Sequence, residues 1–207
     1  MIGDHYLRLE KSLVKSSDEI IVIAASATDA VKTTLEIVDS FSTRDLIIGE
    51  QAGSSGVFEQ RNGYVNHDQT LIVGQAGHGV YRNTGGGLQA DTILLGRYAG
   101  SEGIFELAGD GAWLHTGATL IGHEGVGQFV HTAGWHDTGT IEIGTWDATG
   151  HYAFNGGWLG AQSLRINNGD FTWTGGELDV ADVRIGTNMS ASGQPGTFVQ
   201  DLGLYNT

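Results

Sequence analysis

Hydrophobic and polar positions along the chain follow one phrase that returns about every 23 residues. The phrase opens with alternating apolar residues that end at a glycine, as in Leu46-Ile47-Ile48-Gly49. A Gly-x-aromatic triplet follows, as in Gly56-Val57-Phe58, and a further glycine, Gly63, comes five residues after the aromatic residue. Self-similarity at a period of this length indicates a repeat architecture in which each copy packs on its neighbours.

The aromatic position is filled in seven successive copies, and the residue two before it is always glycine. The aromatic residues are Phe58, Tyr81, Phe105, Phe129, Tyr152, Phe171 and Phe198. In the opening strand, the residues three and one before the corner glycine are apolar in nearly every copy, and alternation with period two places both on one face. We therefore expect parallel strands stacked into rungs, with one aromatic and two aliphatic columns inside.

The repeat predicts an all-β fold, a parallel β-helix (β-solenoid) of about eight rungs. Residues 46–207 form seven clear rungs, and residues 19–45 read as a degenerate first rung. In that rung Ile21-Val22-Ile23 replaces the opening strand, Leu35 takes the aromatic place and Phe41 corresponds to Tyr64. Terminal repeats are expected to be atypical because one of their faces has no neighbour.

Residues 1–18 differ from the repeat and are predicted to form a short amphipathic helix that acts as a cap. Asp4 is the expected N-cap, and basic residues separate the apolar ones. The apolar helix face consists of Tyr6, Leu7, Leu9, Leu13 and Val14.

The residue two before each corner glycine is expected to point outward. Along the rungs this position is first apolar and then charged, with Glu142, Arg165 and Arg184 in the later copies. The apolar part, which we call the apolar column, is Val22, Ile47, Ile72, Leu94 and Leu120. We expect it to be an interface that the N-terminal helix covers, in the same molecule or a neighbouring one.

Composition narrows the class of protein. The chain has 34 glycines and one proline, without collagen-like spacing, so the glycines serve the corners of the repeat. A net charge of −14 disfavours nucleic acid and anionic membranes as partners. There is no cysteine, and no apolar run is long enough to insert into a membrane.

The phrase apolar-x-apolar-Gly, then Gly-x-Phe, then Gly-Gly-x resembles the glycine-rich repeats of autotransporter passengers and of PEP-CTERM-associated surface proteins. Residues 71–86 and 141–157 carry it best, and it extends over about residues 46–207. The resemblance implies an exported, extracellular or cell-surface protein. The chain shows no signal peptide, membrane barrel or sorting tail. We therefore expect a fragment, or a relative that is exported by another route.

No catalytic, metal or cofactor site is predicted. The histidines His115, His123, His131, His136 and His151 cluster in sequence but fall in different columns of the repeat, so we expect ordinary turn or surface histidines. A carboxylate pair such as Glu106 and Asp110 is more simply explained as solvated loop charge.

Tryptophans offer a candidate ligand site. Trp135 and Trp158 each follow a corner glycine in consecutive rungs, and Trp113 is one residue away from that position. Aligned outward rings could stack on sugars, whereas inward rings would fill a corner of the solenoid, and we expect the inward arrangement.

Two main functions follow from these expectations. The first is a non-enzymatic structural protein that forms a fibre, stalk or adhesive layer by rung-to-rung contact, with itself as partner in a head-to-tail homopolymer. The alternative is a carbohydrate-binding module that uses Trp113, Trp135 and Trp158 to bind surface glycans. A polysaccharide-active enzyme is a further alternative, since many such enzymes are β-helices.

Overall fold

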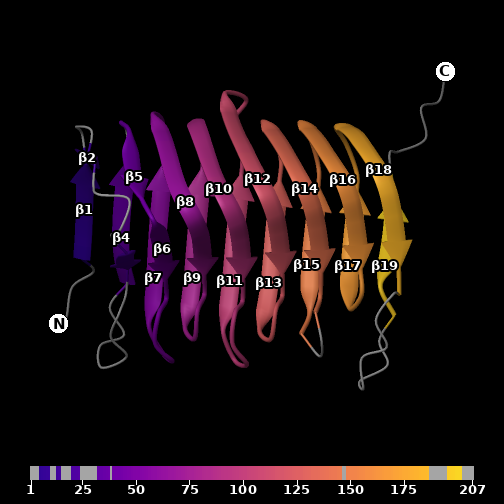
Figure 1. The fold of residues 1–207 in the computed structure, drawn as a ribbon, viewed down its shortest axis with the longest axis horizontal. Helices are drawn as coiled ribbons and strands as arrows, with labels where there is room; N and C mark the ends of the chain where they lie inside the picture. The colour runs from indigo at the N-terminus through magenta and orange to yellow at the C-terminus, as the bar shows by residue number, and fades with distance from the viewer. Residues whose placement is uncertain are drawn as a thin grey trace.

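The computed structural model describes residues 20–23, 39–145, 148–186 and 195–201 with their side chains, and three further strands by their backbone. Every regular element in these residues is a β-strand, and all strand pairs are parallel. The strands stack along one axis, with β1 and β2 at one end and β18 and β19 at the other (Figure 1). The prediction of an all-β parallel β-solenoid with a period of about 23 residues is confirmed, with about seven turns. The eight rungs are not confirmed.

One sheet, which we call sheet 1, contains nine strands and carries the Gly-x-aromatic triplet. Its spatial order follows the chain, and one or two strands of the second sheet lie between consecutive members in the sequence. The strands are β1 (His5–Leu9), β4 (Lys32–Ile37), β7 (Ser55–Gln60), β9 (His78–Asn83), β11 (Glu102–Leu107), β13 (Val126–His131), β15 (Gly150–Phe154), β17 (Gly169–Trp173) and β19 (Thr197–Gln200).

The second sheet, sheet 2, contains ten strands, and in its later turns one strand covers both the third and the opening part of the phrase. The two parts are still separate near the N-terminus, where β6 pairs with β3 and β8. The strands are β2 (Leu13–Val14), β3 (Ile20–Ile23), β5 (Phe41–Thr43), β6 (Asp45–Ile48), β8 (Tyr64–Val73), β10 (Gly86–Leu95), β12 (Ala112–Ile121), β14 (Trp135–Ile143), β16 (Trp158–Ile166) and β18 (Glu177–Ile185).

Glycine makes the corner between the sheets for two reasons. Gly96 has φ 67°, a conformation that residues with a Cβ rarely adopt. Gly103, two residues before Phe105, lies directly against that corner, and a Cβ on it would collide with the carbonyl oxygen of Val73 and the amide nitrogen of Gly96. The corner glycine and the glycine of the Gly-x-aromatic triplet are therefore both required at this corner, the first by its backbone conformation and the second by close packing.

The seven aromatic residues stand in one column of sheet 1, as the strand register shows. Phe58 through Phe171 are completely buried, and Phe198 in the last described strand is half-buried. Ring centroids of neighbours are 4.6–5.2 Å apart, close to the spacing between parallel strands. The rings thus stack on one another as the rungs do.

A second inward column of sheet 1, two residues after the aromatic one, was not anticipated from the sequence. It is chemically mixed: Gln60, Asn83, Leu107, His131, Phe154 and Trp173. Gln60, Asn83 and His131 are buried, and each makes at least one hydrogen bond. For example, the Gln60 amide donates to the carbonyl oxygen of Gly87 and accepts from the Tyr81 hydroxyl.

The predicted N-terminal helix is not confirmed, because His5–Leu9 and Leu13–Val14 are strands. β1 pairs with β4, which sets Leu7 opposite Leu35, and Leu35 is opposite Phe58. Leu7 and Leu9 also fit a period of two, so this short apolar pattern agreed with both helix and strand. The side chains of the predicted helix face, Tyr6 to Val14, lie outside the residues described in full.

The degenerate first rung joins the stack with one shift from the expected alignment. Ile21, Val22 and Ile23 pair with Leu46, Ile47 and Ile48 as expected. Phe41, however, is opposite Val65 rather than Tyr64, and its ring is buried. An inward position explains why this residue is aromatic, since its ring packs 6.0 Å from that of Phe58.

Candidate functional site

Three tryptophans form one outward column on sheet 2, which we call the tryptophan column. Trp113 is opposite Trp135, and Trp135 is opposite Trp158, on the successive strands β12, β14 and β16. The sequence placed Trp113 one residue out of line. The turn between Leu107 and Trp113 is two residues longer than the turn between His131 and Trp135, and this difference brings all three tryptophans to one position of the repeat.

The rings of the tryptophan column are accessible to solvent. Trp135 is 61% exposed and Trp113 is 40% exposed, while Trp158 is partly buried. Tyr64, which is 38% exposed, continues the same column on β8, with Gly87 between it and Trp113. The expectation that these rings fill a corner of the solenoid is therefore wrong, because at this position the strand alternation directs side chains away from the core.

Two glycines leave space for the indole rings to pack flat against the outer surface of the sheet. A Cβ on Gly87 would collide with the ring of Trp113, and a Cβ on Gly160 would collide with the ring of Trp158. Trp113 also contacts Tyr64, with ring centroids 5.6 Å apart, and Trp135 contacts Trp158 at 5.4 Å. The column is therefore a nearly continuous aromatic strip that runs along the solenoid axis.

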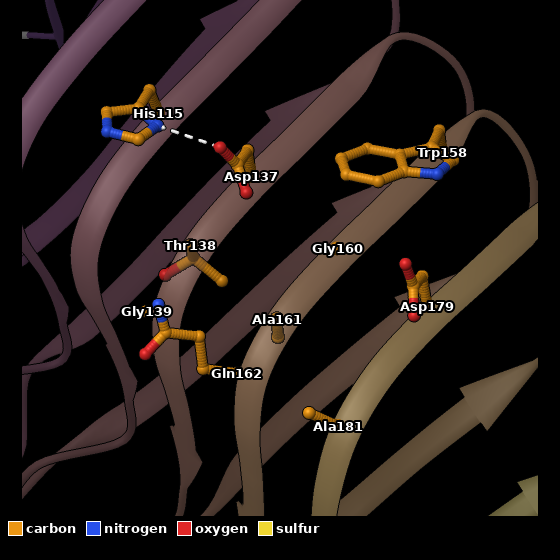
Figure 2. A pocket seen from close by; sticks show the side chains of 10 residues that line it. All are labelled: His115, Asp137, Thr138, Gly139, Trp158, Gly160, Ala161, Gln162, Asp179 and Ala181. Carbon is orange, nitrogen blue, oxygen red and sulfur yellow. Dashed lines mark hydrogen bonds and ion pairs between the residues drawn. The ribbon is translucent and has the colours of Figure 1, made fainter.

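A groove of about 300 Å³ lies beside Trp158 on the outer surface of sheet 2 (Figure 2). Gly160 and Ala161 lie on the strand that carries the ring, β16, and Asp137 and Asp179 come from the strands on either side. Because Asp137 and Asp179 are the register partners of Gly160, the two carboxylates flank the position over which the indole lies.

The polar groups around this groove are mainly hydrogen-bond acceptors. Asp137 interacts with His115, whose Nδ1 lies 3.1 Å from a carboxylate oxygen, and both side chains are more than half exposed. Gln162 adds an amide, and Glu177 is the register partner of Trp158 on β18. No lysine or arginine lines the groove among the residues that the structure describes. The site combines an aromatic surface with negative charge.

The apolar column is present in register but is less exposed than the sequence suggested. Its members pair in the order in which they were predicted, and the column continues into Glu142, Arg165 and Arg184. Ile72 is only 6% exposed and the other four are half-buried. Parallel in-register stacking explains this, since each side chain covers its neighbours. The predicted covering helix is not confirmed, because the described parts of that segment, His5–Leu9 and Leu13–Val14, are strands.

Three histidines are core residues, which corrects the expectation of turn or surface positions. His67, His131 and His136 are at most 1% exposed. Burial lowers the pKa of His67 to about 3 and that of His131 to about 4. Burial also holds the pKa of His136 well below its usual value, with the nearby His131 and His115 adding to the effect. All three are therefore neutral at physiological pH.

The tautomers of His131 and His136 follow from their shared contacts with Tyr152. Nε2 of His131 lies 3.2 Å from the carbonyl oxygen of Gly134 and must donate to it, so Nδ1 accepts from the Tyr152 hydroxyl at 3.2 Å. Nδ1 of His136 then donates to the same hydroxyl oxygen at 3.1 Å, and its Nε2 accepts from the Thr119 hydroxyl at 3.2 Å. The histidines are thus used in the hydrogen bonding of the core.

The other histidines mostly pair with acids across neighbouring turns. His78 contacts Glu102 at 3.0 Å and His151 contacts Asp170. His123 lies near the carbonyl oxygen of Arg97. Among the residues that the structure describes, no three His, Asp or Glu side chains are grouped in a way that could hold a metal ion.

The carboxylates considered for acid–base chemistry are not brought together in the described contacts. Glu106 on β11 binds Arg82 with an oxygen-to-nitrogen distance of 2.7 Å, and Arg82 also binds Glu59 at 3.1 Å. Asp110 is an exposed residue of the turn before β12. Glu59, Arg82 and Glu106 thus form a ladder of ion pairs on the outer surface of sheet 1, across three successive turns.

Comparisons with known proteins do not assign this chain to a family. No family model, no curated protein and no solved structure matches this chain. Within the part of the chain that the structure describes, no helix has the length and hydropathy of a membrane span.

Proposed function

We propose that this protein is a non-enzymatic solenoid that binds carbohydrate through the tryptophan column. The observation that carries the proposal is the in-register exposure of Trp113, Trp135 and Trp158 on three successive strands. Large aromatic rings normally contribute to a core, and a contiguous exposed patch of them is typical of a binding surface.

A sugar chain suits this surface better than a compact ligand does. One ring is available per turn, at the parallel-strand spacing of about 4.8 Å, so the strip favours an elongated ligand that lies along the solenoid axis. The C–H faces of pyranose rings can stack on indoles, and the neighbouring column supplies hydrogen-bonding groups, among them His115 and Asp137. The combination of an apolar floor with a few polar groups is typical of ligand sites.

The test is binding to a glycan array, followed by affinity measurements on the glycans retained. The double variant Trp135→Ala plus Trp158→Ala should lose binding, while its circular dichroism and melting temperature stay near those of the parent. Tyr98→Ala is the matched control, since Tyr98 is 42% exposed but lies outside the column, next to Arg97. Undiminished binding by the double variant, or loss of binding in the control, would overturn the proposal.

A second candidate function is end-to-end assembly into a fibre, stalk or adhesive layer. In the described residues β18 is the last strand of sheet 2, and its Val183 and Ile185 are 45% and 50% exposed although their counterparts in earlier turns are buried. A neighbouring copy could continue both sheets by strand addition. Sedimentation at increasing concentration tests this, and Val199→Pro in β19 should reduce assembly by removing a backbone donor.

Extracellular or cell-surface location is part of the same proposal. It is supported by the resemblance of the repeat to exported surface proteins and by the acidic charge of −14, which favours solubility. Fractionation of the source cells with an antibody would test it, and a purely cytoplasmic signal would count against it.

A further inference from the structure

We infer that the groove beside Trp158 selects an amino sugar with a free, protonated amine, so that the ligand is a cationic polysaccharide. This inference rests on the proposed carbohydrate-binding function and assigns its ligand class. It concerns the groove of Trp158, Asp137 and Asp179 in particular, whereas the wider function concerns the whole tryptophan column.

The first argument is the placement of the carboxylates. Asp137 and Asp179 are each one strand away from Gly160, so their Cα atoms are about 9.6 Å apart at the parallel-strand spacing. The Trp158 ring lies over Gly160, between them. In Figure 2 the indole, Asp137 and Asp179 border the same hollow. A sugar stacked on the indole would therefore have a carboxylate on either side.

The second argument is the attraction of a cation to this particular surface. An ammonium group near an indole face gains a cation–π interaction, and the two carboxylates add ion pairs in which an amine is the donor. The same groups repel uronic acids and sulfated sugars, which carry negative charge. Glu177, opposite Trp158 on β18, strengthens that discrimination.

A neutral sugar is a poorer match for the same lining. Hydroxyl groups need both donors and acceptors, yet the groove offers mostly acceptors. Thr138 is buried and its hydroxyl is already bonded to Thr116 and to the carbonyl oxygen of Thr140. His115 already contacts Asp137, and Gln162 supplies the side-chain amide of the lining.

The experiment compares two soluble oligosaccharides of equal length by titration calorimetry: a β-1,4-linked glucosamine oligomer and its fully N-acetylated form. We expect the glucosamine oligomer to bind more tightly, with an affinity that weakens as salt is added. Asp137→Asn and Asp179→Asn should each weaken it about 3- to 5-fold, as expected for partly exposed ion pairs, with little change for the acetylated form.

Controls separate this inference from the wider proposal. Asp91→Asn removes the same charge from an exposed position of β10 outside the groove and should leave the affinity unchanged. Spermidine provides the positive charge without a sugar, and binding as tight as that of the oligomer would overturn the inference. Preference for the acetylated oligomer, with dependence on Trp158 but not on the aspartates, would overturn the amino-sugar inference and leave carbohydrate binding intact. Failure of both oligomers, together with a blank glycan array, would overturn both.

Discussion

Nδ1 of His136 lies 3.1 Å from the hydroxyl oxygen of Tyr152, and both side chains are completely buried. This hydrogen bond connects a strand of sheet 2 to a strand of sheet 1 inside the core. His131 reaches the same hydroxyl from the preceding strand of sheet 1. Protonation of either imidazole would leave a donor without an acceptor, so the contact links stability to pH.

The protein should lose stability as the pH falls below about 6.5. His67, His131 and His136 have pKa values in the folded state that burial lowers, so the unfolded chain takes up protons first. Stability is then complete above the unfolded pKa and declines between about pH 6.5 and the folded values of about 4 and 3 for His131 and His67. Each histidine adds up to about 1.4 kcal/mol per pH unit to the slope.

Denaturant unfolding of His67→Leu at several pH values isolates one of these contributions. Neither ring nitrogen of His67 has a hydrogen-bond partner among the described residues, so the replacement removes a titrating group without breaking a bond. The slope between pH 4 and 6 should fall by about 1.4 kcal/mol per pH unit. An unchanged slope would contradict the assignment of His67 as a neutral core residue.

Truncation of a ring in the middle of the aromatic column should strongly lower the free energy of unfolding. Phe129 is completely buried and stacks on Phe105 at 4.8 Å and Tyr152 at 4.6 Å. Phe129→Ala should cost about 3–5 kcal/mol in unfolding free energy, as is usual for buried aromatic residues. Phe198→Ala is the control, because Phe198 is half-buried and should cost less. Equal melting temperatures for Phe129→Ala and the parent would contradict the inward column.

The close contact at the corner predicts that Gly103 cannot be replaced without a large loss of stability. Gly103→Ala places a methyl group against backbone atoms of Val73 and Gly96, which cannot move without separating two turns. We expect a loss of several kcal/mol, or failure to fold. Gly111→Ala is the matched control, since nothing lies within 4 Å of a Cβ at that position. A comparison of soluble yield and melting temperature of the two variants tests the contact directly.

The ion-pair ladder on sheet 1 should contribute little at physiological salt. Arg82 bridges Glu59 and Glu106, but its side chain is 36% exposed, so solvent and salt screen both pairs. Arg82→Gln should destabilise by about 1 kcal/mol or less, with the larger effect at low ionic strength, where the two glutamates repel. A loss that does not vary between low and high salt would contradict an electrostatic role.

The sequence predicted those columns in which every member has the same chemistry. The aromatic and aliphatic positions recur at a fixed place, so their register followed from the repeat alone. The inward column of mixed chemistry was missed: His131 occupies the position of Leu107 and Phe154, and a polar residue there hides an inward position. Burial of His136 depends on Tyr152, which lies in the other sheet, and no local pattern reports such a contact.

The candidate site was predicted in composition but not in orientation. Trp135 and Trp158 were aligned from the sequence, whereas the placement of Trp113 required knowledge of how the turn after Leu107 accommodates two additional residues. The flanking carboxylates could not be linked to the tryptophans, because Asp137 and Asp179 meet Gly160 only through strand pairing. The N-terminal helix was not confirmed, and its short apolar pattern agrees with the period of a strand as well as with that of a helix.

The outward column that begins at Val22 and ends at Arg184 gives the rod a direction. Its first five residues are aliphatic and its last three are charged, and they follow one another in register along a single line. Two rods that point the same way in full register match their aliphatic residues, but they also place Arg165 and Arg184 against the same arginines of the neighbour, where like charges repel. Two rods that point in opposite directions and are centred on Ile72 match the same five aliphatic residues without facing the arginines with one another. Lateral contact on this face would therefore favour antiparallel pairs, which close after two copies.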